Sequence, residues 1–224
     1  MRIELAGETM LMAVMNSSTP EQIDGDLLLQ AYINGIFPMA DPEIGVVEWF
    51  RPDPRGVLPL EDFHVPRSLD RRVRSGRFDI SINRDFEGVI RACSTPRSAE
   101  NGSWMIETML QAYLELFDRG FAHSVEARRD GLLVGGLYGI QIGGAFFGES
   151  MFSRPDQGGT DASKVCLVHL VDRLREQGFQ LLDTQFVNDH LQRFGCIEIS
   201  AHEYDRRLGA AIRGSCSFAR HCDD

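Results

Sequence analysis

The stretch ASKVCLVHLVDRLREQGFQLLDTQ, residues 162–185 of 224, decides the fold class of this chain. Residues 162–177 predict an amphipathic helix, because their apolar residues recur at helical spacing. Gly178 is well placed to end that helix. Residues 179–184 then predict a buried strand, so this helix and strand form a crossover in a sheet. The apolar face of the helix consists of Val165, Leu167, Val168, Leu170, Val171 and Leu174.

Working outward, the preceding residues alternate between strand and helix patterns. Predicted strands cover residues 78–82, 122–128, 132–140 and 145–147, and predicted helices cover 85–93 and 106–119. The order strand, two helices, three strands, helix, strand is typical of an α+β domain with a mainly antiparallel sheet that becomes parallel at its last crossover. It resembles the N-acetyltransferase-like (GNAT-like) fold, and we expect a GNAT-like catalytic domain over residues 61–212.

The two ends of the chain differ from this central region. A helix is expected through Ala31 and Tyr32, with Asp24 or Asp26 as its cap and Gly35 as its end. Residues 49–59 are rich in proline and predict extended structure. We therefore expect a small N-terminal domain over residues 1–60 and a disordered tail over residues 213–224.

Composition excludes several classes of protein. Hydrophobic residues at 43% and charged residues at 25% are ordinary globular usage. No stretch approaches the roughly 20 apolar residues that span a bilayer, and we expect a cytoplasmic protein. The five cysteines form no C-x-x-C pair, so neither a disulfide framework nor a metal site is indicated.

The net charge of −10 argues against a nucleic-acid partner unless cations are concentrated locally. They are concentrated in RSLDRRVRSGR, residues 67–77, where Arg67, Arg71 and Arg74 would share one face of a helix. This pattern is compatible with a phosphate-binding surface. It is equally compatible with an arginine-rich face that only contacts water.

Two segments carry candidate acyl-transfer chemistry. Glu149 lies in GESMFS, residues 148–153, which we interpret as a Gly/Ser turn. Asp183 and Gln185 are two residues apart in the last strand, so their side chains are expected on one face. Residues 153–161 would be a poor cradle for coenzyme A, because Pro155 lacks an amide hydrogen and the nearby aspartates repel pyrophosphate.

Further motifs, each weak alone, occur in order along the chain: LLLQAYINGIFP (27–38), PDPR (52–55), SW (103–104), AHSVE (122–126), LVGGLYG (133–139) and QFVNDHLQRFG (185–195). Together with GESMFS and DASK (161–164), they resemble the leucyl/phenylalanyl-tRNA–protein transferases. The resemblance covers most of the chain. It implies an aminoacyltransferase that moves Leu or Phe, and less readily Met, from charged tRNA to proteins beginning with Arg or Lys, which marks them for N-end rule degradation. It implies no metal and no cofactor, coenzyme A included.

The resemblance also assigns site residues. It implies that Gln185 meets the incoming amine, that Asp183 polarises it and that Glu149 binds the substrate's α-amino group. An amide is hardly basic, so we expect Gln185 to orient the amine and Asp183 or water to receive the proton. Asn188 is a further substrate-binding candidate, or equally a helix cap. Arg67, Arg71 and Arg74 match the family's basic patch for the tRNA acceptor stem.

The matched motifs imply an apolar pocket for the transferred amino acid. Its expected lining is Trp104, Leu137, Phe146, Met151, Leu170, Leu174 and Leu182, with Met39 at a position where many relatives have Trp. Leu170 and Leu174 could equally be ordinary core residues. The Leu-to-Phe preference therefore stays open.

Two rival interpretations remain at the level of sequence. One is a related transferase that uses the same donor with a non-protein acceptor. The other is a tRNA-binding module without catalytic activity. Acceptor specificity separates the first from our expectation, and loss of activity on changing Asp183 separates the second.

Overall fold

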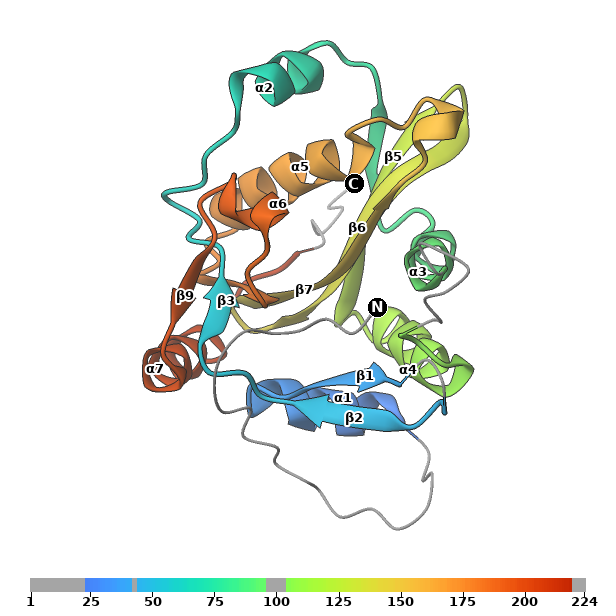
Figure 1. Cartoon of the computed structure of the whole chain (residues 1–224). Coiled ribbons are helices and arrows are strands. Elements are labelled where there is room, and N and C mark those ends of the chain that lie inside the picture. The colour runs from blue at the N-terminus through green and yellow to red at the C-terminus, as the bar shows by residue number, and fades with distance from the viewer. Residues whose placement is uncertain (1–22, 42–43, 96–103, 219–224) are drawn as a thin grey trace.

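The computed structural model describes residues 23–41, 44–95 and 104–218 (Figure 1). Its large sheet has the strand order β4-β5-β6-β7-β8-β3-β9, and a separate hairpin pairs β1 with β2. The strands are β1 (Phe37–Ala40), β2 (Val47–Phe50), β3 (Arg55–Val57), β4 (Asp79–Ile82), β5 (Ala122–Arg129), β6 (Leu132–Ile142), β7 (Ala145–Ser153), β8 (Leu181–Gln185) and β9 (Ile197–Ile199). The α-helices are α1 (Gly25–Ile33), α2 (Arg67–Arg74), α3 (Phe86–Ser94), α4 (Glu107–Asp118), α5 (Ala162–Glu176), α6 (Asp189–Gln192) and α7 (Ala201–Ala211), and a 3-10 turn, η1, covers Pro155–Gln157.

The predicted α+β class is confirmed, and so is the predicted order of elements from β4 to β8. Adjacent strands pair antiparallel except β7 with β8, which are parallel as the crossover through α5 requires. The helix at the N-terminal end also forms as expected. Asp24 caps α1, since its carboxylate accepts a hydrogen bond from the backbone N–H of Leu27.

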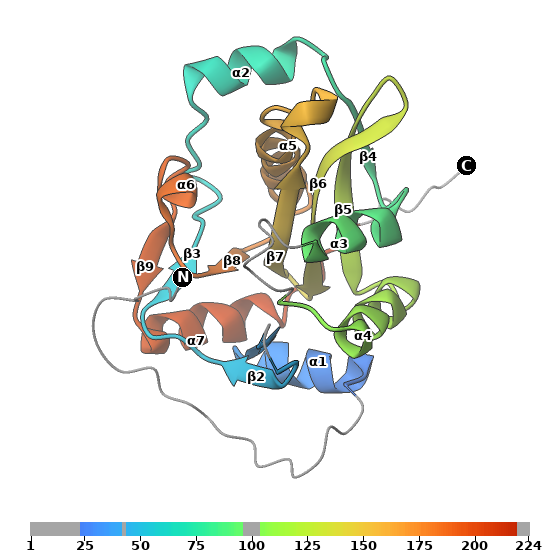
Figure 2. The same cartoon turned by 45° about the vertical axis from the view of Figure 1, so that its right-hand side comes forward.

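Helices cover both faces of the large sheet (Figure 2). On one face, α5 and the anchoring residue of α2, Leu69, bury an apolar layer against β5, β6 and β7. On the other face, α1, α3, α4 and α7 contribute to a second apolar core, which also takes in residues of the β1–β2 hairpin. The sheet is therefore buried on both sides through its centre, where the chain is rich in apolar residues and glycine.

The expected boundary at residue 60 does not separate an N-terminal domain from the rest of the chain. β3 lies between β8 and β9 in the large sheet, and Leu58 and Leu60 belong to the core beneath α5. Residues 55–60 are thus part of the large domain. The hairpin and α1 share their core with α4.

The chain beyond α7 also packs on the domain as far as it is described. Phe218 is fully buried, and its ring stacks on Phe146 with 5.1 Å between centroids. The Arg173 side chain donates a 2.6 Å hydrogen bond to the Phe218 carbonyl, and the Phe218 N–H donates to the Gln141 side chain. The expectation of a disordered tail from residue 213 is therefore wrong for residues 213–218, while residues 219–224 lie outside the described part. Among the described helices, none is long and apolar enough to cross a membrane.

Candidate active site

The candidate site lies where β7 and β8 separate. Their pairing ends at Phe147 opposite Asp183, but β7 continues to Ser153. The prediction that the GESMFS segment forms a turn is therefore wrong, because it is the second half of β7. Two parallel strands that diverge leave main-chain and side-chain groups of both available to a ligand, as at other strand ends in open sheets.

A β-bulge places Glu149 at this point. Tyr138 pairs with Ser150 and Gly139 with Gly148, so Glu149 has no partner residue on β6. An extra residue shifts the alternation of side chains beyond it. The bulge therefore allows Glu149 to face the tyrosines of one core while Met151, two residues on, packs against the core under α5. The alternation in the sequence does not reveal this shift, which is why the strand was predicted too short.

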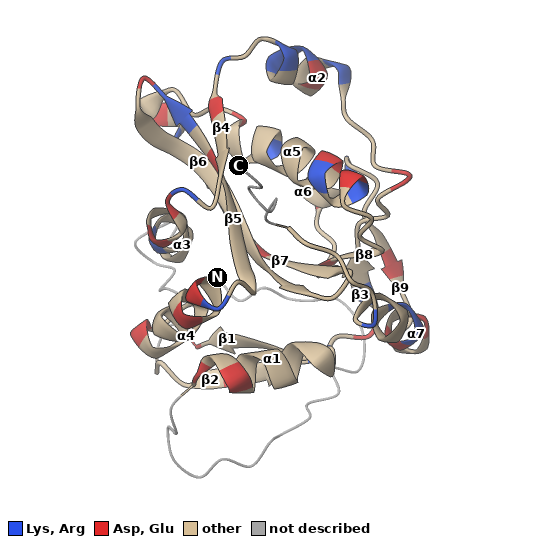
Figure 3. Ribbon diagram, turned by 180° about the vertical axis from the view of Figure 1, so that it is seen from behind, with Lys and Arg blue, Asp and Glu red and all other residues tan. Residues whose placement is uncertain are grey.

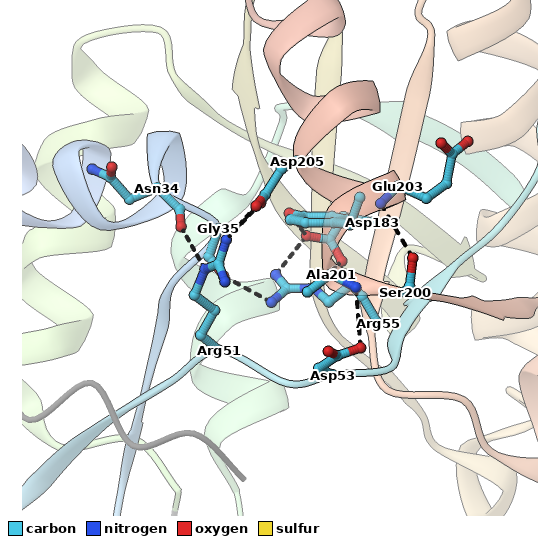
Figure 4. A network of polar contacts seen from close by, with 11 residues as sticks. Asn34, Gly35, Arg51, Asp53, Arg55, Asp183, Ser200, Ala201, Glu203 and Asp205 are labelled. Carbon is cyan, nitrogen blue, oxygen red and sulfur yellow. Dashed lines mark hydrogen bonds and ion pairs between the residues drawn. The ribbon is translucent and has the colours of Figure 1, made fainter. Parts of the chain in front are cut away.

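Asp183 is fully buried and uses its whole carboxylate in hydrogen bonds (Figure 4). Arg55 donates to it twice, from Nε to Oδ1 at 2.9 Å and from Nη2 to Oδ2 at 2.7 Å. The Tyr204 hydroxyl donates to Oδ2 at 2.6 Å, and the Gln185 backbone N–H donates to Oδ1 at 2.8 Å. A carboxylate offers about four acceptor positions, so Asp183 has little capacity left to receive a proton from a substrate.

Arg55 is as deeply buried as its partner. Its guanidinium lies over the rings of Phe37 and Tyr204 and donates a third hydrogen bond to the carbonyl of Gly35. Burial alone would lower the pKa of Arg55, but the ion pair with Asp183 more than offsets this and raises it. The pair is a fixed, charged support for the end of β8.

Glu149 has a different environment. Gln185 Nε2 donates to Glu149 Oε1 at 2.8 Å, and the Tyr113 hydroxyl donates to Oε2 at 3.2 Å. The Tyr113 hydroxyl is also 2.8 Å from the Tyr32 hydroxyl. Burial of the carboxyl group raises the pKa of Glu149 to about 7, and the charge of Asp183 adds to this, while the tyrosine hydroxyls oppose it. Glu149 is therefore the acidic group of the site that changes its charge near neutral pH.

Gln185 joins the two carboxylates. Its backbone bonds to Asp183 and its side-chain N–H bonds to Glu149. Because Nε2 is held by a carboxylate, the side-chain carbonyl is left to accept a hydrogen bond from a ligand. The φ angle of Gln185 is +60°, in the left-handed region that residues other than glycine seldom occupy. Such backbone strain is concentrated at functional sites.

The residues predicted for catalysis are thus brought together. Glu149, Asp183 and Gln185 form one hydrogen-bonded chain, and the structure adds four partners that the sequence analysis did not select. These are Tyr32, Arg55, Tyr113 and Tyr204. Arg55 stands in the PDPR motif, but the sequence does not show that it is buried against Asp183. The tyrosines carried no signal that separates them from core residues.

The residues predicted to line the apolar pocket also lie together, but in the core on the α5 side of the sheet. Five are buried there, with Met151 partly buried beside them. They are Leu137, Phe146, Leu170, Leu174 and Leu182. Met39 and Trp104 lie in the opposite core, where the Trp104 carbonyl accepts a hydrogen bond from the N–H next to Met39, that of Ala40.

Asn188 caps α6, since its side chain accepts a hydrogen bond from the Leu191 N–H at 2.9 Å. The capping interpretation is confirmed. The arginines of α2 form the blue segments of that helix in Figure 3. Arg67, Arg71 and Arg74 are exposed, Arg72 is half-buried and pairs with Asp161, and Arg67 and Arg71 lack a carboxylate partner within the described residues. Arg74 pairs with Asp70 on the same helix. Within the described residues, no group of three His, Cys, Asp or Glu could hold a metal ion.

Two comparisons with known sequences identify the family. The model of the leucyl/phenylalanyl-tRNA protein transferase family matches residues 57–209, and the model of that family's N-terminal domain matches residues 21–53. A leucyl/phenylalanyl-tRNA–protein transferase from Paramagnetospirillum magneticum is 52% identical over 200 residues, which cover 89% of this chain and 94% of the relative.

Solved structures match more loosely. A ribosomal-protein-alanine N-acetyltransferase from Brucella melitensis matches 50% of this chain and 81% of its own, with 19% identity and a TM-score of 0.38. A GCN5-related N-acetyltransferase-like protein from Streptococcus suis matches 78% of this chain and 64% of its own, with 15% identity and a TM-score of 0.38. On the sequence matches, which span both regions of the chain, this protein belongs to the leucyl/phenylalanyl-tRNA–protein transferase family of enzymes.

Proposed function

We propose that this protein transfers leucine and phenylalanine, and methionine less readily, from charged tRNA to the N-terminal α-amino group of proteins that begin with Arg or Lys. The modified proteins then enter N-end rule degradation. A cytoplasmic location is part of the proposal, because charged tRNA is the donor. The observation that carries it is the hydrogen-bonded chain from Asp183 through Gln185 to Glu149 at the gap between β7 and β8.

The reaction is aminolysis of an ester. The acceptor's amine nitrogen forms a bond to the carbonyl carbon, and the bond from that carbon to the ribose 3′ oxygen breaks. One proton leaves the nitrogen, and the ribose 3′ oxygen takes up one proton from water and leaves as a hydroxyl group. An aminoacyl ester is already activated, so holding the amine against it can supply much of the rate. The side-chain carbonyl of Gln185 is oriented to hold that amine, because its Nε2 is fixed by Glu149.

Asp183 acts in this proposal as a positioning residue. One of its four hydrogen bonds fixes the backbone of Gln185, and together the four leave Asp183 little capacity to receive a substrate proton. An amide carbonyl is barely basic, so the proton goes to water rather than to Gln185. Glu149 in its ionised form binds the α-ammonium group of the aminoacyl donor by a charge-assisted hydrogen bond.

The apolar residues under α5 receive the leucine or phenylalanine side chain. They border the strand gap through Met151 on β7 and Leu182 on β8. Met151 is suited to this place, since an unbranched thioether adapts to side chains of different shape. Trp104 and Met39 contact the terminal adenosine from the opposite core. Arg67, Arg71 and Arg74 bind the acceptor stem by its backbone and shape, which allows tRNAs of different sequence to serve. No metal and no coenzyme take part.

The test is transfer of radiolabelled Leu, Phe and Met from their tRNAs to matched peptides that begin with Arg, Lys, Glu or acetyl-Arg. We expect transfer to the free Arg and Lys peptides only. Transfer to the Glu peptide would contradict the acceptor assignment. Absence of transfer to all four would contradict the proposed function.

A further inference from the structure

A cavity of about 430 Å³ opens beside the second half of β7, on the side from which β8 has diverged. Residues of β7 itself and of three helices, α3, α5 and α6, line it. These helices lie around β7 in Figure 2. Among its lining residues are Met151, Phe152, Arg154, Ser163 and His190. Apart from Met151, none of these residues has a role in the reaction as described above.

Arg154 brings a positive charge to this cavity. Its guanidinium lies over the Phe152 ring and donates one hydrogen bond, from Nη1 to the Leu133 carbonyl. It forms no ion pair with a carboxylate of the described residues, unlike Arg51, which lines another groove and pairs with Asp205. An arginine held in place by an aromatic ring and a carbonyl, with its other N–H groups left over, is prepared to bind an anion.

Ser163 supplies a second donor. The Ser153 hydroxyl accepts a hydrogen bond from the Ser163 backbone N–H at 2.9 Å and donates its own proton to Ser163 Oγ at 3.0 Å. A hydroxyl has one proton, so Ser153 has spent its proton on Ser163. The proton of the Ser163 hydroxyl is left to donate to a ligand in the cavity.

The charge of the lining is positive. It contains Arg154 and no Asp or Glu, in a protein with a net charge of −10. The nearest acidic residue of α5's N-terminal turn, Asp161, is itself paired with Arg72 and Lys164. Through Arg72, the helix that carries the exposed arginines is thus tied to the turn that borders the cavity.

The distance between the reacting groups and this cavity matches the length of one nucleotide. Glu149, Met151 and Ser153 follow one another along β7, and at about 3.3 Å per residue Ser153 is roughly 13 Å from Glu149. The middle of the cavity lining, at Met151, is about half as far. A nucleotide whose 3′ ester lies at the strand gap would place its ribose against Met151 and its 5′ phosphate near Arg154 and Ser163.

We propose that this cavity is a phosphate subsite, which holds the 5′ phosphate of the terminal adenosine of the charged tRNA through Arg154 and Ser163. The inference rests on the proposed function and names the part of the donor that this region binds. It gives the donor a second anchor between the acceptor-stem arginines of α2 and the strand gap. Loss of this anchor weakens use of the donor without changing the ester chemistry.

The experiment compares two small donors on the full chain, 3′-O-leucyl adenosine and its 5′-monophosphate, with an Arg peptide as acceptor. The wild-type protein should use the phosphorylated donor about 10- to 100-fold better in kcat/KM, the range for hydrogen bonds to a charged group. Arg154→Gln should reduce this advantage to less than threefold, and Ser163→Ala should reduce it in part. Both variants should keep wild-type activity on the unphosphorylated donor, which shows that they fold.

Arg213→Gln, a change of equal charge at an exposed position after α7, should leave the phosphate advantage intact. Equal use of both donors by the wild-type protein would overturn the subsite while leaving the proposed function standing. No transfer from either donor or from charged tRNA would instead overturn the proposed function. If coenzyme A suppressed transfer by the wild-type protein but not by Arg154→Gln, the cavity would be a coenzyme site, and the assignment to tRNA would be wrong.

Discussion

Gln185 and Glu149 are joined by a 2.8 Å hydrogen bond across two strands that do not pair with each other at this level. The bond fixes which end of the Gln185 amide faces a ligand. It also makes the two side chains act as one unit, so changes at the two positions should not be additive.

Gln185→Ala should lower kcat for leucyl transfer by about 10²-fold, the loss expected when a reacting group is misplaced by about 1 Å. Glu149→Gln should lower transfer as well, because a neutral amide cannot pair with an ammonium group. The double variant should be no worse than the poorer single variant, as judged by steady-state kinetics. Additive losses would mean that the two residues act independently.

The pH dependence of stability should report on Glu149. Its pKa is raised from 4.5 to about 7 in the folded protein, mainly by burial. The folded state therefore binds more protons than the unfolded state between these values, and stability falls as the pH rises through this window. The loss should be at most about 3 kcal/mol. Urea denaturation at pH 5 and pH 8 should show it as a difference between the wild type and Glu149→Gln. The comparison is needed because burial lowers the pKa of His123 to about 4, which makes both proteins gain stability from His123 as the pH rises from 5 to 8.

Glu203 provides the control for that measurement. Hydrogen bonds from Arg206 and then Arg207 lower the pKa of Glu203 to about 2. Its contribution to stability is present above pH 4.5 and is lost only as the pH falls toward 2. Glu203→Gln should therefore keep the wild-type difference between pH 5 and pH 8.

Arg55→Met should cost about 3–5 kcal/mol of unfolding free energy, because it leaves the Asp183 carboxylate buried without a counter-charge. The matched change is Arg51→Met, which breaks the neighbouring but exposed pair with Asp205 (Figure 4). It should cost less than about 1 kcal/mol. Chemical denaturation measures both. Equal effects would show that the buried pair carries no special role in holding β3 to β8.

The exposed arginines of α2 should set the salt dependence of tRNA binding. Arg67→Gln with Arg71→Gln should weaken binding and reduce the slope of log K against log salt by about 2, or roughly one unit per lost phosphate contact. Filter binding over a salt series measures the slope. Arg206→Gln with Arg207→Gln on α7 changes the net charge equally and should leave the slope unchanged.

Phe218 should be essential for stability although it lies close to the end of the chain. Phe218→Ala should cost about 3–5 kcal/mol, as for other large buried aromatic residues. The nearby exposed Ser215→Ala should be close to neutral in the same thermal or chemical denaturation. If Phe218→Ala left the unfolding free energy unchanged, residues 213–218 would not pack on the domain in solution.

Much of the fold follows from local patterns. The apolar spacing that predicts α5, and the period-two alternation that predicts β4, are properties of a few neighbouring residues. The caps of α1 and α6 are equally local. The bulge at Glu149 is not, because it depends on which residues of β6 lie opposite. That is why the sequence predicted a turn there.

The ion pair between Arg55 and Asp183, which supports the site, could not be predicted for a related reason. Arg55 and Asp183 are 128 positions apart, and nothing in either segment states that β3 inserts between β8 and β9. Short strands such as β3 and β9, with three residues each, carry too little pattern to place. Glu149, Asp183 and Gln185 were predicted from the resemblance of their motifs to a known family. The tyrosines around Glu149 could be identified only in the packed structure.

The place of β3 between β8 and β9 has a consequence for synthesis on the ribosome. The Asp183 carboxylate needs Arg55, made early, and Tyr204, made late. A nascent chain that has released β8 but not α7 therefore lacks one of the groups that hold Gln185. The reactive end of β8 therefore acquires its full set of hydrogen bonds only once α7 has been synthesised.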